Sequence, residues 1–269
     1  MPTAVVIPAK NEAKNIGIVL RNTSLLGPDL IVVVVNGSED HTLEEALHYS
    51  STGTHIIEFR EALGVDVPRA LGAKYAYLWG AEIVVFIDGD MVGNIGAAVQ
   101  NLILGIKGGT DLAMVNCYPY ITHRVGVVEE MLDFRKLLNH ELGLFRALGV
   151  ASPSQGPHAV SRRLLKEIGF DSFAIPPLEL TLAKKANMNI QVHAALPNIV
   201  LDTDTKSQEH IKAIIETIIG DCVEAIHHLR GCPRKRTWGK AEYIGYNRER
   251  RFDLLEDAMI LLEGLPLWQ

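Results

Sequence analysis

The chain has 269 residues, of which 48% are hydrophobic and 22% charged, and it carries a formal net charge of -6 at pH 7. This length and composition predict a globular protein with a substantial core, arranged as one large domain or two modest ones. The acidic balance argues against a nucleic-acid partner, and no apolar run approaches the roughly 18–20 residues that an integral membrane segment needs.

The first half of the chain alternates between apolar runs and stretches in which apolar residues recur at helical spacing. Strands are expected at 4–8, 30–35, 55–59 and 83–87, and helices at 11–26, 39–49, 67–79 and 96–105. Continuous apolar strands separated by helices predict a mostly parallel sheet that is buried on both faces. Right-handed crossovers then bring the C-terminal ends of the strands to one edge of the sheet, where ligands collect.

The second half predicts more helix than strand. Expected here are a strand at 111–117, a long helix at 127–148, a proline-bearing loop at 149–157, a short strand from His158, helices at 161–168 and 177–186, and a strand at 190–194. From Ser207 onward we expect two helices divided by the basic stretch 231–236. The simplest organisation is a domain at 1–205 with a helical C-terminal extension at 206–269.

Cysteine usage and the N-terminal residues bear on the compartment. The three cysteines, Cys117, Cys222 and Cys232, are widely spaced and form no C-x-x-C pair, so neither a disulfide framework nor a thiolate metal site is expected. The opening residues MPTAVVIPAKNE lack the basic start and apolar run of a secretory signal. We therefore expect a cytoplasmic protein.

Polar clusters follow three of the expected strands, at 8–12, 36–40 and 88–90. In the third cluster Asp88 and Asp90 flank Gly89, and if the strand continues, both carboxylates project to the same side. Two adjacent carboxylates repel unless a cation lies between them, and Mg²⁺ or Mn²⁺ prefers such hard oxygen ligands together with phosphate oxygens. The structural alternative is that Asp88 caps a turn and Asp90 caps the next helix.

The three clusters together resemble a known family. The order of VVIPAKNE at 5–12, VVVVNGSEDHT at 32–42 and FIDGD at 86–90 resembles the GT-A glycosyltransferases of the family 2 type. The resemblance implies a Rossmann-like α/β fold, a nucleotide-sugar donor, and Mg²⁺ or Mn²⁺ held by the D-x-D residues. It also implies a nucleotide-binding half at about 1–118 and an acceptor half at about 119–205.

A fainter resemblance is to the retaining glucosyl- or mannosyl-3-phosphoglycerate synthases. It is carried by His123-Arg124-Val125, at the start of an expected helix, and by the LELTL stretch at 178–182. The implied acceptor is small and anionic, of the phosphoglycerate kind. A homodimer is left open.

The resemblance implies roles for individual residues. The nucleotide would be bound by Pro8, Asn11, Glu12, Asn36, Ser38, Arg69 and Asp88. The metal would be held by Asp88 and Asp90, with His193 or His210 as the third ligand. The expected catalytic residues are Asp90, Glu179 near the transferred sugar, and Arg124 against the anionic acceptor.

The chain departs from the family pattern at several positions. Val35 stands where the second signature has an Asp, so uracil specificity does not follow from the resemblance. The synthases' diphosphate-binding Lys corresponds to Val67 or Pro68. Inverting family 2 enzymes carry Glu-Asp where this chain has Glu179-Leu180, and that missing Asp is their catalytic base. We therefore favour a retaining transfer, in which the leaving phosphate takes the proton of the acceptor.

Each candidate also has a structural alternative. Asn11 and Glu12 are suited to capping the first helix. Arg69 could instead be a solvated charge on a helix, and Glu179 an acid on a helix surface. The basic stretches 234–236 and 248–251 are expected on solvated faces, with attraction of an anionic acceptor or an acidic lipid surface as the alternative.

Three other functions remain open at this point. One is a different family 2 transferase, for example one that acts on a polyprenyl phosphate. Another is a nucleotidyltransferase, although residues 8–12 do not resemble the glycine-rich loop that opens such enzymes. The third is a non-catalytic nucleotide-binding protein with the GT-A fold.

Overall fold

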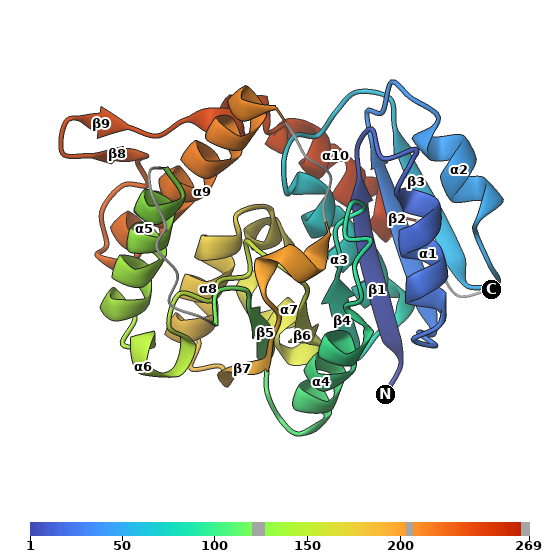
Figure 1. The fold of residues 1–269 in the computed structure, drawn as a ribbon, viewed down its shortest axis with the longest axis horizontal. Helices are drawn as coiled ribbons and strands as arrows, with labels where there is room; N and C mark the ends of the chain where they lie inside the picture. The colour runs from blue at the N-terminus through green and yellow to red at the C-terminus, as the bar shows by residue number, and fades with distance from the viewer. Residues whose placement is uncertain (120–126, 203–206, 265–269) are drawn as a thin grey trace.

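A computed structural model describes residues 1–119, 127–202 and 207–264. A mixed sheet with the strand order β3-β2-β1-β4-β6-β5-β7 forms its centre (Figure 1). The strands are β1 (Thr3–Ala9), β2 (Leu30–Asn36), β3 (Thr54–Phe59), β4 (Ile83–Phe86), β5 (Leu112–Asn116), β6 (His158–Ser161) and β7 (Ile190–Ala195). Strand β6 runs antiparallel to β4 and β5, whereas the other pairings are parallel. The expected mostly parallel α/β sheet is confirmed.

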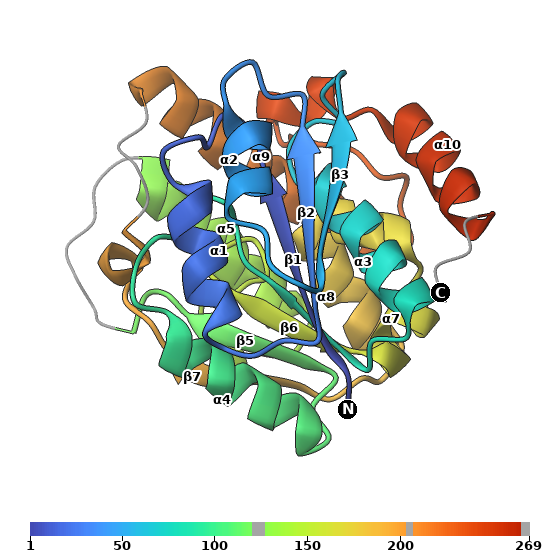
Figure 2. The same cartoon turned by 90° about the vertical axis from the view of Figure 1, so that its right-hand side faces the viewer.

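Helices cover both faces of the sheet, as Figure 2 shows. One face carries α1 (Ile16–Ser24), α2 (Thr42–His48) and α4 (Gly96–Lys107), and the other carries α3 (Val67–Trp79), α7 (Arg162–Ile168) and α8 (Pro176–Lys185). Because successive side chains of a strand point to opposite faces, β1 contributes Val5 to the first core and Val6 to the second. Helix α3 packs close to β1, since a Cβ at Gly72 would lie 2.3 Å from a methyl group of Val6.

The observed elements agree with the expected ones except at some boundaries. The first helix begins at Ile16 rather than at residue 11, because Asn11 adopts a left-handed conformation with a φ of 57°. The long helix expected at 127–148 is broken into α5 (Val127–Glu141) and α6 (Phe145–Leu148). The break contains Gly143, whose φ of 68° is incompatible with a continuous α-helix.

The C-terminal extension folds back onto the rest of the chain. Helix α9 (Gln208–Leu229) packs against α5 and α8. A hairpin of β8 (Thr237–Trp238) and β9 (Ala241–Glu242), which the sequence analysis did not predict, follows it and leads through η3 (Gly245–Glu249) to α10 (Phe252–Glu263). Helix α10 packs against α3, so the extension spans from the second half back to the first (Figure 1).

Two further 3₁₀ turns border the sheet, η1 (Phe170–Ala174) before α8 and η2 (Asn198–Leu201) after β7. Within the described parts of the chain, no helix combines the length and the apolar character that crossing a membrane requires.

Candidate active site

The ends of β1, β2 and β4 meet at one edge of the sheet, as expected. Ala9 pairs with Val35, and the chain beyond β4 stays beside β1 because the Gly89 amide donates to the carbonyl of Pro8 at 3.0 Å. The D-x-D residues themselves form a turn rather than an extended strand, with the Met91 amide donating to the carbonyl of Asp88 at 3.0 Å. The strand does not continue through these residues, because β4 ends at Phe86. The condition under which both carboxylates would project to the same side of a strand is therefore not met.

Gly89 is required by packing as well as by the turn. A Cβ at this position would lie 3.0 Å from the carbonyl oxygen of Pro8 and 3.1 Å from the Cβ of Ala9. Any side chain here would press the D-x-D turn away from β1. The glycine thus keeps Asp88 at the joined ends of the parallel strands.

Arg69 is the residue that most closely engages the D-x-D turn. It lies in the first turns of α3, with its side chain only 6% exposed, and its Nη2 is 2.6 Å from Oδ1 of Asp88. Its Nη1 is 3.3 Å from Oδ1 of Asp66 and donates to the carbonyl of Pro153 at 3.4 Å. Burial alone would lower the pKa of Arg69, but the carboxylates of Asp88 and Asp66 outweigh it and raise the pKa. A solvated role for Arg69 is therefore wrong, and the site holds a fixed positive charge.

The loops after β1 and β2 are joined by side chains from both signatures. Oδ1 of Asn11 accepts from the Glu39 amide at 2.8 Å, and Oγ of Ser38 accepts from the Asn11 amide at 3.1 Å. The Glu12 amide donates to Oγ1 of Thr42 at 2.7 Å. Asn11 does not cap the first helix, which begins at Ile16. These contacts fix the shape of the loop edge at which the nucleotide is expected.

The side chain of Asn36 makes contacts within the protein that the sequence did not predict. Its buried amide donates to the carbonyl of Gly64 at 3.2 Å and accepts from the Leu63 amide at 2.6 Å. The side chain therefore ties the end of β2 to the loop that precedes α3. A direct contact between Asn36 and a nucleotide stays a prediction.

Glu179 lies in the first turn of α8. Two prolines at Pro176 and Pro177 start that helix, as proline readily does, and the acid in the first turn suits the helix dipole. The Glu179 side chain is 1% exposed, and its Oε1 is 3.6 Å from Nε2 of His158. The alternative of a surface acid is therefore wrong.

His158 was predicted as the start of a strand, and a role for it in the site was not favoured. It pairs with Phe86 at the end of β4, and the two rings stack with centroids 4.7 Å apart. Both ring nitrogens of His158, and Oε1 of Glu179, are buried without a hydrogen-bond partner. Two buried titratable groups with unused hydrogen-bonding capacity thus lie beside the strand that leads to Asp88, which is typical of functional sites.

The loop at 149–157 closes another side of the site. Arg135 of α5 is buried, and it donates to Oε1 of Gln155 at 2.6 Å and to Oγ of Ser154 at 2.9 Å. Gln155 in turn donates to Oδ1 of Asn198, the first residue of η2. The sequence analysis identified this segment only as a proline-bearing loop, because the arginine that holds it is distant in the chain.

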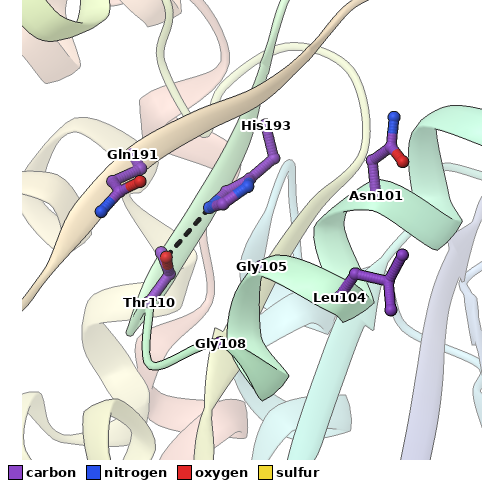
Figure 3. Close-up of a pocket in the computed structure, with 7 residues that line it drawn as sticks. All are labelled: Asn101, Leu104, Gly105, Gly108, Thr110, Gln191 and His193. Atoms are coloured by element: carbon purple, nitrogen blue, oxygen red, sulfur yellow. Dashed lines mark hydrogen bonds between the residues drawn. The ribbon is translucent and has the colours of Figure 1, made fainter.

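The expected third metal ligand lies elsewhere. His193 is on β7, at the far edge of the sheet from β4, with Nε2 2.9 Å from Oγ1 of Thr110 and the ring against Gly105 (Figure 3). Nδ1 of His210 is 2.9 Å from the hydroxyl of Tyr246. Across residues 1–119, 127–202 and 207–264, no three His, Cys, Asp or Glu side chains gather as a metal-binding group.

The correction for His193 has a topological reason, because two strands, β6 and β5, separate β7 from β4. Asp88 and Asp90 remain as the proposed protein ligands. Two carboxylates fit Mg²⁺ or Mn²⁺ when phosphate oxygens and water complete the coordination. The proposed acceptor residue Arg124, together with His123, lies outside the described residues.

Comparisons with known proteins identify the family and the fold. The family model for glycosyl transferase family 2 matches residues 4–169. Glucosyl-3-phosphoglycerate synthase from Mycobacterium tuberculosis, solved in complex with Mn²⁺, uridine diphosphate and phosphoglyceric acid, is similar with a TM-score of 0.63 and 22% identity, over 86% of this chain and 79% of that one. Another structure of that synthase has a TM-score of 0.62 and 21% identity, over 86% and 81% of the two chains. No curated protein matches the chain.

The similarity to the solved structures, at this level of identity, establishes the fold. It confirms the expected GT-A architecture with a helical C-terminal region. The family model ends at residue 169, before Glu179 and before the C-terminal extension, so the positions of those parts rest on the structure alone.

Proposed function

The chain belongs to glycosyl transferase family 2, and on this basis we propose that it moves a sugar from a nucleotide-sugar donor, bound through Mg²⁺ or Mn²⁺, to a small anionic acceptor. The single observation that carries the proposal is the ion pair between Arg69 and Asp88 at the joined ends of β1 and β4. It places a fixed positive charge on one of the two D-x-D carboxylates, at the edge where a nucleotide diphosphate is expected.

The donor half of the mechanism rests on charge. Asp88 and Asp90 would hold the metal, which when bound supplies Lewis-acid stabilisation of the leaving diphosphate. Arg69 fixes the Asp88 carboxylate by a charge-assisted hydrogen bond and adds positive potential to the site. Because leaving-group charge develops in the transition state, a preorganised cation here lowers the barrier.

The transfer half rests on Glu179 and its surroundings. The next residue, Leu180, is fully buried in the core, so that position offers no carboxylate for an inverting base. We therefore propose a retaining transfer, with a leaving phosphate oxygen taking the proton of the acceptor hydroxyl. Glu179, held in the buried pair with His158, would accept a hydrogen bond from the transferred sugar or the acceptor.

The acceptor is proposed to be a phosphoglycerate-like anion. The similar M. tuberculosis synthase was solved in complex with phosphoglyceric acid, and Arg124 is the residue of this chain proposed to meet the anion. Arg135 holds Ser154 and Gln155 in the loop at 149–157, and these polar side chains are further candidates for contact with the acceptor.

The test is a thermal-shift panel of the common nucleoside diphosphates and sugar nucleotides, each with Mn²⁺, Mg²⁺ or EDTA. It uses the wild type, Asp90→Asn, and Asp257→Asn as a matched control that changes an exposed acid on α10. A ligand at about a hundred times its dissociation constant stabilises a protein by roughly 2.7 kcal/mol. We expect a metal-dependent rise in melting temperature in the wild type and in the control variant. This rise should be absent in Asp90→Asn.

Incubation of the same nucleotide sugar with 3-phosphoglycerate then tests the transfer itself. Formation of a glycosylated product, with the anomeric configuration read by NMR, would support the acceptor and the retaining outcome. Binding without any turnover would indicate a non-catalytic nucleotide-binding protein. No binding of any nucleotide would refute the proposal.

A further inference from the structure

The C-terminal extension reaches the D-x-D turn through a continuous series of ion pairs. We propose that Arg250, which follows η3, is a positioning residue of the donor site: it holds Asp66, and through Asp66 it keeps Arg69 on Asp88. This inference rests on the proposed donor site, and it assigns a part of that site to the helical extension.

Arg250 is buried as completely as a core residue. Its side chain is 0% exposed, and its Nη1 and Nη2 form a two-pronged pair with Oδ1 and Oδ2 of Asp221 at 2.7 and 2.9 Å. Nε donates to the carbonyl of Val65 at 3.1 Å, Nη1 to Oδ1 of Asn247 at 3.2 Å, and Nη2 to Oδ2 of Asp66 at 3.2 Å. Each nitrogen of the guanidinium is thus used, in a planar arrangement that a lysine cannot reproduce.

Asp66 is held in a costly conformation between the two arginines. It precedes α3 with a φ of 64°, which is uncommon outside glycine, and its side chain does not cap the helix. Instead, Oδ1 faces Nη1 of Arg69 at 3.3 Å and Oδ2 faces Nη2 of Arg250 at 3.2 Å. A strained residue that persists because its surroundings fix it is a common feature of functional sites.

Backbone contacts between the loop at 63–66 and residues 249–251 hold this arrangement in place. The Arg251 amide donates to the carbonyl of Leu63 at 2.8 Å. Gly64, with a φ of 91°, touches the extension so closely that a Cβ would lie 2.5 Å from the carbonyl oxygen of Glu249. The extension therefore supports the loop at 63–66, which also receives the side chain of Asn36 from the end of β2.

The sharing of Asp66 explains why Arg250 matters for Asp88. Because Arg250 occupies one carboxylate oxygen, Arg69 receives only the other and keeps its Nη2 for Asp88. If Arg250 is removed, the Asp66 carboxylate is free to rotate and to bind both prongs of Arg69, which is the stronger geometry. Nη2 then leaves Asp88, and the D-x-D turn loses its fixed cation.

Arg236 provides a matched control within the same cluster. It is also buried, and its Nη1 lies 2.5 Å from the same Oδ1 of Asp221, but its other partners are Glu224, Thr217 and Tyr243. Arg250→Lys and Arg236→Lys therefore each disturb a buried pair with Asp221, which is two-pronged for Arg250 and single for Arg236. Only the first change removes the link to Asp66.

The experiment compares these two variants with the wild type in two measurements. The first is calorimetric binding of uridine diphosphate, and in parallel guanosine diphosphate, in the presence of Mn²⁺. Partners that orient a ligating residue typically contribute about 10- to 100-fold in affinity. We expect Arg250→Lys to weaken binding by about tenfold or more, and Arg236→Lys to change it by less than about twofold, with similar losses of melting temperature.

The second measurement needs no ligand. The side-chain ¹⁵N signals of Arg69, identified by their loss in Arg69→Lys, are compared in the free proteins. We expect them to move or broaden in Arg250→Lys and to stay in place in Arg236→Lys. Asp66→Asn, which breaks the next link, should resemble Arg250→Lys and serves in its place if that variant does not fold.

The outcomes distinguish a failure of the positioning role from a failure of the proposed function. Unchanged Arg69 signals in Arg250→Lys, or equal effects of the two lysine variants, would overturn the positioning role. A wild type that binds neither diphosphate would refute the proposed function, while the Arg69 signals would still decide whether Arg250 positions Arg69.

Discussion

Replacing Arg69 by methionine should lower both the free energy of unfolding and the binding of a nucleoside diphosphate. The substitution keeps the apolar length of the side chain and removes the cation that pairs with Asp88 at 2.6 Å and with Asp66 at 3.3 Å. Breaking a buried ion pair by deleting one partner costs about 3–5 kcal/mol. Because the Asp88 side chain is 28% exposed and water screens it in part, we expect the low end, about 3 kcal/mol.

The double variant Arg69→Met/Asp88→Asn tests the origin of that loss. It removes both charges, so it should be more stable than the sum of the two single changes predicts, by about 1 kcal/mol or more. Diphosphate binding should be absent in both Arg69→Met and the double variant. Urea unfolding followed by circular dichroism measures the stabilities, and calorimetry measures binding.

Additive losses, to within about 0.5 kcal/mol, would mean that the two side chains do not interact in solution. Recovery of diphosphate binding in the double variant would show that the cation serves only to neutralise Asp88. Either result would refute the reasoning that Arg69 acts on both the turn and the ligand.

Two further predictions concern Glu179 and the cysteines. Glu179→Gln replaces a buried carboxyl group, one of whose oxygens has no hydrogen-bond partner, with a neutral amide. We expect the rate of sugar transfer to fall by about 100-fold while the melting temperature stays the same or rises. An unchanged transfer rate would exclude Glu179 from the reaction. Burial raises the pKa of Cys117 to about 11 and of Cys222 to about 12, whereas Cys232 is exposed. Iodoacetamide at pH 8 should therefore label the folded chain at Cys232 alone by mass spectrometry, since the thiolate is the reactive form, and label on Cys222 would contradict its burial.

The sheet, and the edge at which the polar clusters meet, could be predicted from the sequence because both follow from local patterns. Apolar runs such as the one ending at Asn36 can be buried on both faces only in a sheet with helices on each side. The parallel direction of such strands then brings Asp88 and Asn11 to one edge without any knowledge of side-chain contacts. The break at Gly143 was missed because apolar residues recur at helical spacing on both sides of it.

The detailed site was harder to predict, because its decisive contacts join distant parts of the chain. Charge patterning predicted the stretch at 248–251 on a solvated face. Arg250 is instead buried and paired with two carboxylates, one on α9 and one just before α3. His193 was misplaced because residue type and position in a strand do not reveal the order of strands in a sheet. His158 was missed because its partner, Glu179, is contributed by a different element.

The return of the C-terminal extension to the first half also bears on how the protein folds during synthesis. The contact between Asp66 and Arg250 spans 184 positions of the chain. Domains generally fold from the N-terminus as they leave the ribosome, and distant contacts form late. The nascent N-terminal half therefore emerges with Arg69 as the cation beside Asp66, and the second partner of that carboxylate arrives only after residue 250 has left the exit tunnel. During synthesis Asp66 is thus paired only with Arg69, and the second ion pair forms when the C-terminal extension docks.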